Sequence, residues 1–209
     1  MSTGRNMKEK TRIAVLVSGG GTNLQALIDA ERAGKIPSGT LALVVSNNPG
    51  AYALERAKAA NINTAVVAKK EVGAAFEKRL IETLCDHRID MIVLAGFMSI
   101  LSANFTARYP KRIINVHPAL IPAFCGKGMY GLHVHEAALR YGVKVSGATV
   151  HYVNEIPDGG EILLQKAVQV RPGDTPEQLQ RRIMEQAEWK ILPRATELVA
   201  KRIMKEGKK

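Results

Sequence analysis

The chain has 209 residues, of which 46% are hydrophobic and 23% charged, and an excess of lysine and arginine gives it a net charge of +11. This composition is that of an ordinary globular protein, and it excludes collagen-like, disordered and disulfide-rich chains. The two cysteines, Cys85 and Cys125, lack Cys-x-x-Cys spacing, which indicates reduced thiols and no zinc site.

The sequence contains no segment with the character of a membrane helix or a secretory signal. The longest apolar stretch, Met91–Met98, is far shorter than the roughly 18–20 residues that span a bilayer. No hydrophobic segment follows the polar start Met1–Thr11, as a cleaved signal requires. We therefore expect a soluble, cytoplasmic protein that does not associate with membranes.

The positive charge is concentrated at the two ends of the chain. Residues 1–12 carry a net charge of +3 and residues 201–209 a net charge of +4. The mild positive field of the remainder is suited to steering small anionic substrates. The aromatic residues do not alternate with lysine or arginine, so we expect no nucleic-acid partner. We expect one domain over residues 12–200, between flexible basic tails at 1–11 and 201–209.

Strand and helix patterns alternate through the first half of the chain. Continuous apolar or β-branched runs predict strands at Arg12–Val17, Leu41–Ser46, Thr64–Val67, Met91–Ala95 and Arg112–Val116. Helices are predicted between them at Asn23–Ala33, Ala51–Ala60 and Val72–His87. Buried strands separated by helices indicate a parallel sheet that is covered on both faces. The first half is therefore predicted to be a doubly wound, Rossmann-like unit.

The second half has a different pattern. Val145–Val153 and Glu161–Val170 are β-rich runs on either side of the turn Pro157–Gly160, which predicts a hairpin and hence antiparallel strands. Thr175–Gln178 has the residues of a capping box with proline at the first helical position. We expect a long helix from there towards Leu192, kinked or ended by Pro193. The predicted fold is a single-domain α/β protein with a mostly parallel sheet and a long C-terminal helix.

A glycine-rich loop, Ser18–Asn23, joins the first strand to the first helix. The free amides of Thr22 and Asn23 open the helix towards an anion. A dinucleotide fingerprint would need glycine at Leu24 and an acidic residue where Ser46–Asn48 stands. A single terminal phosphate is therefore the better candidate ligand, and a merely tight turn is the alternative.

Asn115 and His117 lie at the end of the predicted strand Arg112–Val116, where open α/β sheets bind ligands. Alternate residues of a strand share a face, so an amide donor stands beside an imidazole. Such a pair can stabilise and protonate an oxyanion. The alternative is a histidine that only forms structural hydrogen bonds.

Four other polar residues are open to more than one interpretation. Asp158, in Pro-Asp-Gly-Gly, is a turn former unless the turn lies beside His117. His133, His135 and His151 suggest a metal cluster, but residues two apart on a helix point in different directions. Hydrogen bonding at the helix N-terminus is therefore expected for His133 and His135, and no metal is expected.

Four segments together resemble one enzyme family. They are the loop Ser18–Asn23, Leu94–Met98, Asn115–Pro122 and Asp158–Gly160. In this order and over nearly the whole chain, they resemble the phosphoribosylglycinamide formyltransferases, folate-dependent enzymes of purine biosynthesis. The resemblance implies transfer of a formyl group from 10-formyltetrahydrofolate to the glycyl amine of glycinamide ribonucleotide, without a metal.

The resemblance also implies roles for individual residues. Asn115 and His117 would stabilise the tetrahedral intermediate, and Asp158 would keep His117 protonated and oriented. Residues of the ribotide site would be Gly20, Gly21, Thr22 and Asn23, which hold the phosphate, and Glu188, which contacts the sugar. Residues of the folate site would be Phe97, Met98, Ser99, Ile100, Leu101, Val153, Asn154, Glu155 and Asp158.

Two positions depart from the family pattern at the folate site. Gly73 and Ser99 stand where arginine occurs in members of the family, so Lys69 and Lys70 are candidates to hold the glutamate tail of the folate. The loop 124–131 is rich in glycine and is expected to act as a mobile lid.

Other functions stay open at this level. The same folate could be hydrolysed by water, or its formyl group could pass to another amine. A protein that only binds folate or a phosphorylated metabolite is a further alternative. The sequence allows either a monomer or a homodimer.

Overall fold

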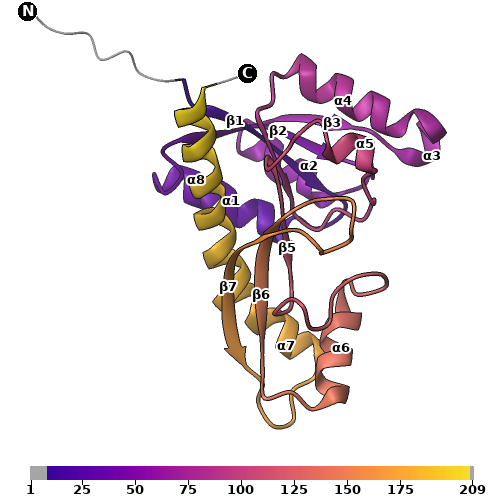
Figure 1. Ribbon diagram of the computed structural model, residues 1–209, viewed down its shortest axis with the longest axis vertical. Coiled ribbons are helices and arrows are strands. Elements are labelled where there is room, and N and C mark those ends of the chain that lie inside the picture. The colour runs from indigo at the N-terminus through magenta and orange to yellow at the C-terminus, as the bar shows by residue number, and fades with distance from the viewer. Residues whose placement is uncertain (1–8, 208–209) are drawn as a thin grey trace, which may run out of the picture.

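A seven-stranded sheet forms the centre of the protein, in a computed structural model that describes residues 9–207 (Figure 1). The strands are β1 (Thr11–Val17), β2 (Gly39–Ser46), β3 (Asn63–Val66), β4 (Met91–Leu94), β5 (Ile113–His117), β6 (Val145–Tyr152) and β7 (Ile162–Gln169). Their spatial order is β3-β2-β1-β4-β5-β6-β7. The first five pair in parallel and the last two add antiparallel strands, which confirms the predicted fold class.

Helices cover both faces of this sheet. They are α1 (Thr22–Arg32), α2 (Tyr52–Ala59), α3 (Lys69–Val72), α4 (Phe76–Asp86), α5 (Ala103–Thr106), α6 (Leu132–Tyr141), α7 (Pro176–Ile183) and α8 (Trp189–Glu206). A 3-10 turn, η1 (Gly73–Ala75), precedes α4, and a π-helical turn, η2 (Met184–Glu188), joins α7 to α8.

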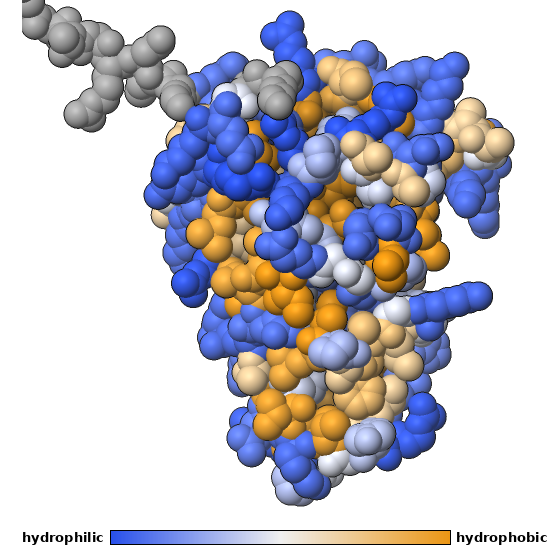
Figure 2. Space-filling view, in the orientation of Figure 1, coloured by the Kyte–Doolittle hydropathy of each residue, from blue (hydrophilic) through white to orange (hydrophobic). Residues whose placement is uncertain are grey.

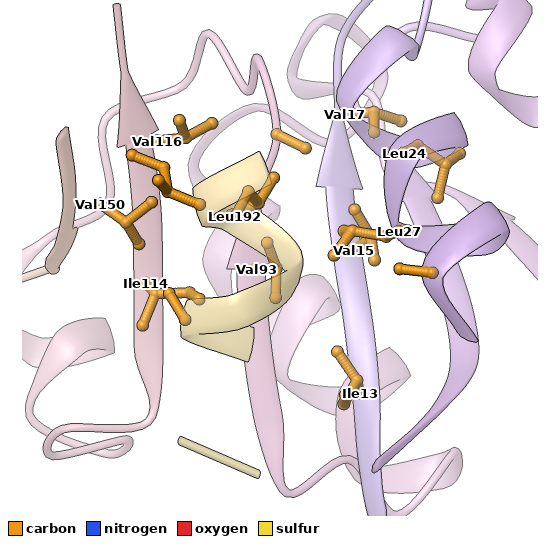
Figure 3. Packing of buried hydrophobic residues seen from close by; sticks show 14 of the residues in the cluster. Ile13, Val15, Val17, Leu24, Leu27, Val93, Ile114, Val116, Val150 and Leu192 are labelled. Carbon is orange, nitrogen blue, oxygen red and sulfur yellow. The ribbon is translucent and has the colours of Figure 1, made fainter. Parts of the chain in front are cut away.

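The central strand β1 is apolar from Ile13 to Val17 because both of its faces are buried there. Its odd-numbered residues, such as Ile13 and Val15, pack against α1 and α8 in one core (Figure 3). Its even-numbered residues, Ala14 and Leu16, pack with α4 and α5 in a second core.

Two predicted helix boundaries were wrong. The helix expected over Val72–His87 is interrupted, because Gly73 adopts φ 53° and the 3-10 turn separates α3 from α4. The helix expected to end or kink at Pro193 instead runs as α8 to Glu206. Pro193 lacks one backbone donor, but burial of Leu192 and Ala195 on the same helix outweighs that loss.

The ends of the domain extend beyond the predicted limits. Thr11 belongs to β1, and its buried hydroxyl donates to the Ala200 carbonyl at 2.8 Å. Residues 201–206 continue α8, with Ile203 fully buried, and so belong to the folded domain. The remainder of the two predicted tails, residues 1–8 and 208–209, lies outside the described residues.

The edge strand β7 exposes part of the sheet. Figure 2 shows apolar side chains gathered over β6 and β7, and Val145 and Ile162 are among the exposed large hydrophobic residues.

None of the helices in the described part of the chain has the length and apolar character needed to cross a membrane.

Gly147, in the buried part of β6, provides a test of the pairing between β6 and β7. A Cβ atom there would lie 2.1 Å from the backbone carbonyl oxygen of Lys166 on β7. Because that oxygen belongs to the backbone, the clash cannot be relieved by rotating a side chain. We expect Gly147→Ala to lower the free energy of unfolding by about 3 kcal/mol in urea denaturation. Gly50→Ala, whose Cβ would make an ordinary 3.5 Å contact, is the control. Equal stability of the two variants would contradict the pairing.

Candidate active site

Strand β5 carries the predicted pair Asn115 and His117 at its carboxyl end. Its neighbour β6 runs antiparallel, and the register places His151 opposite Asn115 and Thr149 opposite His117. His117 is buried, with 4% of its surface exposed. The two side chains are therefore positioned by a sheet that is fixed on both sides.

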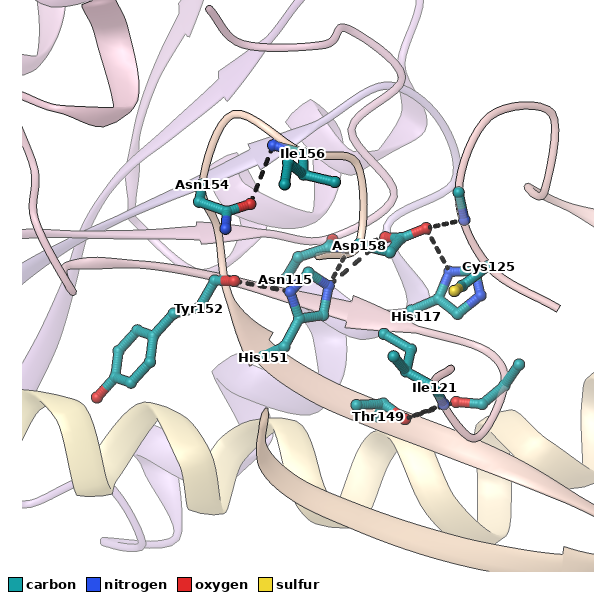
Figure 4. Close-up of polar contacts among 12 residues, drawn as sticks. Asn115, His117, Ile121, Cys125, Thr149, His151, Tyr152, Asn154, Ile156 and Asp158 are labelled. Atoms are coloured by element: carbon teal, nitrogen blue, oxygen red, sulfur yellow. Dashed lines mark hydrogen bonds and ion pairs between the residues drawn. The ribbon is translucent and has the colours of Figure 1, made fainter. Parts of the chain in front are cut away.

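Asp158 joins this pair from the loop between β6 and β7 (Figure 4). Its Oδ2 lies 3.5 Å from His117 Nδ1, and its Oδ1 lies 3.5 Å from Asn115 Nδ2. The Gly126 N–H donates to Oδ2 over 2.9 Å. Asp158 has φ 57°, which is uncommon for a residue with a side chain and is held by these contacts. It is thus both a turn residue and a neighbour of His117.

The loop 124–131 determines which nitrogen of His117 faces Asp158. His117 Nε2 lies 2.8 Å from the carbonyl oxygen of Phe124. A carbonyl can only accept, so Nε2 carries a proton and Nδ1 is the atom directed at Asp158. In the neutral ring, Nδ1 has a lone pair and is available to take a proton.

The ionisation of this pair depends on burial as well as on charge. Burial lowers the pKa of His117, and Asp158 raises it by less, so the net pKa lies below 6.5. Asp158 thus acts on the pKa of His117 in the expected direction, but burial acts against it and has the larger effect. Burial raises the pKa of Asp158, but the neighbouring imidazole of His151, the N–H of Gly126 and the imidazole of His117 together lower it more, so the carboxylate is ionised at neutral pH.

His151 is a member of the site that sequence reasoning considered only as a metal ligand. It is buried, and its Nδ1 lies 2.8 Å from the Tyr152 carbonyl oxygen, so Nδ1 carries the proton. Its Nε2 lies 3.3 Å from Asn115 Nδ2 and 3.5 Å from Asp158 Oδ1. Nε2 therefore accepts from Asn115 and fixes the amide with its NH₂ group towards the site. The position opposite Asn115 depends on strand register, which local sequence does not show.

The glycine loop has the geometry that its sequence predicts. Gly21 precedes α1 with φ 74°, and a Cβ there would lie 2.7 Å from the Cβ of Ala53, so glycine is required. No side chain caps this helix, which leaves its first amides open. Arg56 Nε donates to the Gly20 carbonyl at 2.8 Å and holds the loop.

Glu188 lies beside this loop, and its predicted contact with the ribotide sugar stays a prediction. The Asn23 Nδ2 donates to Glu188 Oε2 over 2.6 Å, and Asn23 Oδ1 is buried without a partner among the described residues. Glu188 ends the π-helical turn η2 and is only 5% exposed. Burial raises the pKa of Glu188 to about 7, against a smaller lowering by Asn23. The two residues form a polar corner that can pair with hydroxyl groups of a ligand.

The residues predicted to hold folate converge from two segments. A small pocket of about 130 Å³ is lined by Phe97, Ser99, Ile100, Leu101, Val153, Asn154, Glu155 and Asp158, together with Asn115 and His151. Met98 lines the larger adjoining cavity. Ser99 Oγ accepts a hydrogen bond from Asn47 Nδ2 at 2.9 Å. Folate binding at these residues stays a prediction.

The larger cavity, of about 730 Å³, connects the parts of the site. It is lined by Phe97–Ile100, Asn115–Pro118, the loop residues 126–131, His135, Asp158 and Glu188, among others. A cavity of this size, with polar groups converging at one point, is suited to small-molecule substrates.

The remaining histidines do not form a metal site. His133 and His135 both lie on α6 and point apart, with His133 exposed and His135 buried. His133 Nδ1 contacts Glu136, whereas neither ring nitrogen of His135 has a partner among the described residues, so the hydrogen bond expected for His135 is absent. Burial lowers the pKa of His135 to about 4. Within residues 9–207, no cluster of three or more His, Cys, Asp or Glu side chains could hold a metal.

Comparison with known proteins gives consistent matches. A family model described as "Formyl transferase" matches residues 11–196. The chain is 43% identical over 184 residues to phosphoribosylglycinamide formyltransferase of Haemophilus influenzae, which covers 87% of this chain and 84% of that protein. A crystal structure of glycinamide ribonucleotide transformylase 1 from Symbiobacterium toebii superposes with a TM-score of 0.87 at 41% identity, covering 96% of this chain and 93% of the other.

Longer relatives also match. The chain is 43% identical over 195 residues to the human trifunctional purine biosynthetic protein adenosine-3, which covers 92% of this chain. That alignment takes in 19% of the human protein, so the chain spans about a fifth of the length of this relative.

The raised pKa of Glu188 predicts a pH dependence of stability. A carboxyl group whose pKa rises from 4.5 to about 7 on folding stabilises the protein fully below pH 4.5, and that contribution is lost as the pH rises through about 7. Glu188→Gln removes the titration but keeps an oxygen for Asn23. We expect the stability of the wild type relative to Glu188→Gln to fall by about 3 kcal/mol between about pH 5 and pH 8. Urea denaturation of both across this range measures it, and parallel curves would contradict the assignment.

Proposed function

Because this chain belongs to the formyl transferase family, we propose that it transfers the formyl group of 10-formyltetrahydrofolate to the glycyl amine of glycinamide ribonucleotide. This is the phosphoribosylglycinamide formyltransferase reaction of purine biosynthesis. The observation that carries the proposal is the convergence of Asn115, His117 and Asp158 on one cavity in a chain whose relatives bear this name.

The folate would occupy one part of the cavity, and the ribotide would extend from Glu188, which lines the cavity, to the glycine loop beside it. The ribotide phosphate fits the open amides of Gly21, Thr22 and Asn23 at the start of α1, where the helix dipole favours an anion. The sugar hydroxyls fit the corner made by Asn23 Oδ1 and Glu188. The folate fits the pocket formed by residues 97–101 and 153–158. This arrangement brings the ribotide amine and the formyl group together beside His117.

Asn115 would stabilise the charge that develops in the reaction. The amine nitrogen attacks the formyl carbon, and the formyl oxygen becomes an oxyanion. Asn115 Nδ2 lies 3.3 Å from His151 Nε2 and 3.5 Å from Asp158 Oδ1, and one of its two N–H groups would donate to this oxygen when substrate is bound. Because His151 fixes the amide before the substrate arrives, the donor needs no reorganisation during the reaction.

His117 would move the proton that the amine must lose. Its Nδ1 lone pair accepts this proton, and the resulting imidazolium is stabilised by the Asp158 carboxylate at 3.5 Å. The C–N10 bond of the intermediate then breaks, and the same proton passes from Nδ1 to the leaving nitrogen. The Phe124 carbonyl supports both steps because it keeps the other proton on Nε2.

The overall reaction is tested by its requirement for both substrates. Purified protein is mixed with 10-formyl-dideazafolate, and release of the deformylated product is followed by absorbance. We expect turnover with glycinamide ribonucleotide and none without it. Equal turnover without the ribotide would identify a hydrolase, turnover only with another amine in an acceptor panel would identify a different transferase, and tight binding without turnover would identify a binding protein.

The proposed roles of Asn115 and His117 predict large losses of activity. Loss of an oxyanion donor lowers the rate on the order of 10²- to 10³-fold, and loss of the proton carrier on the order of 10²- to 10⁴-fold. We expect Asn115→Ala and His117→Ala each to lower kcat by at least about 10²-fold with unchanged circular dichroism. His133→Ala, an exposed histidine outside the cavity, is the matched control. Near-normal kcat in either variant would refute the role of that residue.

A further inference from the structure

Lys127 lies at the rim of the larger cavity, on the loop 124–131. Among the described residues that line this cavity, it is the one lysine or arginine. The carboxyl groups lining the same space are Asp158 and Glu188. Both substrates of the proposed reaction carry anionic groups, a phosphate on the ribotide and a glutamate carboxylate on the folate. The cavity therefore offers these anions a single charged partner of opposite sign.

The ammonium group of Lys127 is available for a ligand. Lys127 is exposed, and its ammonium group forms no ion pair with a carboxylate in the described part of the chain. Lys111, by comparison, is held by Glu161 at 2.7 Å. A lysine without such a partner among the described residues gains more from a bound anion than one that must first give up a partner.

Lys127 lies in a turn that the Met129 N–H closes onto the Gly126 carbonyl at 3.1 Å, and the start of the loop is anchored. Phe124 and Gly126 are tied to His117 and Asp158 by the hydrogen bonds described above. Gly126 and Gly128, on either side of Lys127, have φ of 89° and 85°, and a Cβ at either would meet nothing within 4 Å. The side chain can therefore adjust to a ligand without disturbing the anchored end of the loop.

Other basic residues near the site are placed elsewhere. Arg56 uses Nε on the Gly20 carbonyl and Nη1 on Gln25. Lys69 and Lys70, considered for the folate tail, line neither the folate pocket nor the larger cavity. At the folate end, Ser99 accepts a hydrogen bond from Asn47, and no lysine or arginine is among the described residues that line the folate pocket.

From these observations we propose that Lys127 binds the anionic group of a bound substrate and determines how tightly that substrate is held. The anion is either the ribotide phosphate or a glutamate carboxylate of the folate, and the test separates them. The inference rests on the proposed function for the identity of the substrates. Since Phe124 and Gly126 hold His117 and Asp158 through backbone atoms, loss of the Lys127 amine leaves the catalytic residues in place. The effect should fall on KM rather than on kcat.

The test compares Lys127→Met, Lys127→Arg and the control Lys78→Met, an exposed lysine of α4 outside the cavities. KM is measured for glycinamide ribonucleotide, and for 10-formyl-dideazafolate with one and with three glutamates. We expect Lys127→Met to raise one KM on the order of 10- to 100-fold, with kcat changed by less than about threefold. Lys127→Arg should restore most of the affinity because it keeps the charge.

Binding by calorimetry identifies the anion and keeps this test separate from that of the reaction. If Lys127 binds the phosphate, Lys127→Met weakens binding of the ribotide but not of the phosphate-free glycinamide riboside. If it binds the folate tail, the loss grows with the number of glutamates. Unchanged affinity for both substrates, or a loss independent of phosphate and glutamates, would overturn the proposal. Absence of turnover in the wild type would overturn the proposed function instead, since binding is still measured.

Discussion

The hydrogen bond from His117 Nε2 to the Phe124 carbonyl is the constraint on which the chemistry of this site depends. Because the carbonyl can only accept, it fixes the proton on Nε2 and leaves Nδ1 to face Asp158. The same loop donates to Asp158 through Gly126, so one segment orients both members of the pair. Burial then lowers the pKa of His117, which makes a neutral imidazole with a free lone pair the form present at neutral pH. These contacts therefore favour a role for His117 as an acid and base that takes up and releases a proton, rather than as an imidazolium that stays charged throughout.

The mixed sheet provides the frame for this arrangement. Parallel strands β1, β4 and β5 bring the glycine loop and the Asn115 pair to the same end of the sheet. The antiparallel strand β6 adds His151 beside Asn115, and the loop after it folds back to place Asp158 over β5. On the other side, the π-helical turn η2 carries Glu188 to Asn23. Wide helical turns of this kind are often found at functional sites, where they direct a side chain that a regular helix would point elsewhere.

Much of this fold could be predicted from the sequence, because burial on both faces requires continuous apolar strands such as Ile13–Val17. The candidate residues Asn115 and His117 could be found because two residues on one strand share a face. His151 could not be assigned, because its place opposite Asn115 depends on the register between β5 and β6, which local sequence does not show. The net direction of the pKa shift of His117 could not be predicted, since the opposing effects of burial and Asp158 depend on distances that sequence does not give. Pro193 was misjudged because tertiary packing of α8 outweighs a local preference.

The central claim is that formyl transfer takes place between Asn115 Nδ2 and His117 Nδ1. A crystal structure with glycinamide ribonucleotide and an unreactive analogue of 10-formyltetrahydrofolate measures it most directly. The account predicts the acyl oxygen about 3 Å from Asn115 Nδ2 and the ribotide amine within hydrogen-bond reach of His117 Nδ1. It also predicts that Nε2 stays bonded to the Phe124 carbonyl. An acyl group bound away from this pair, or a His117 ring that presents Nε2 to the substrates, would contradict the account.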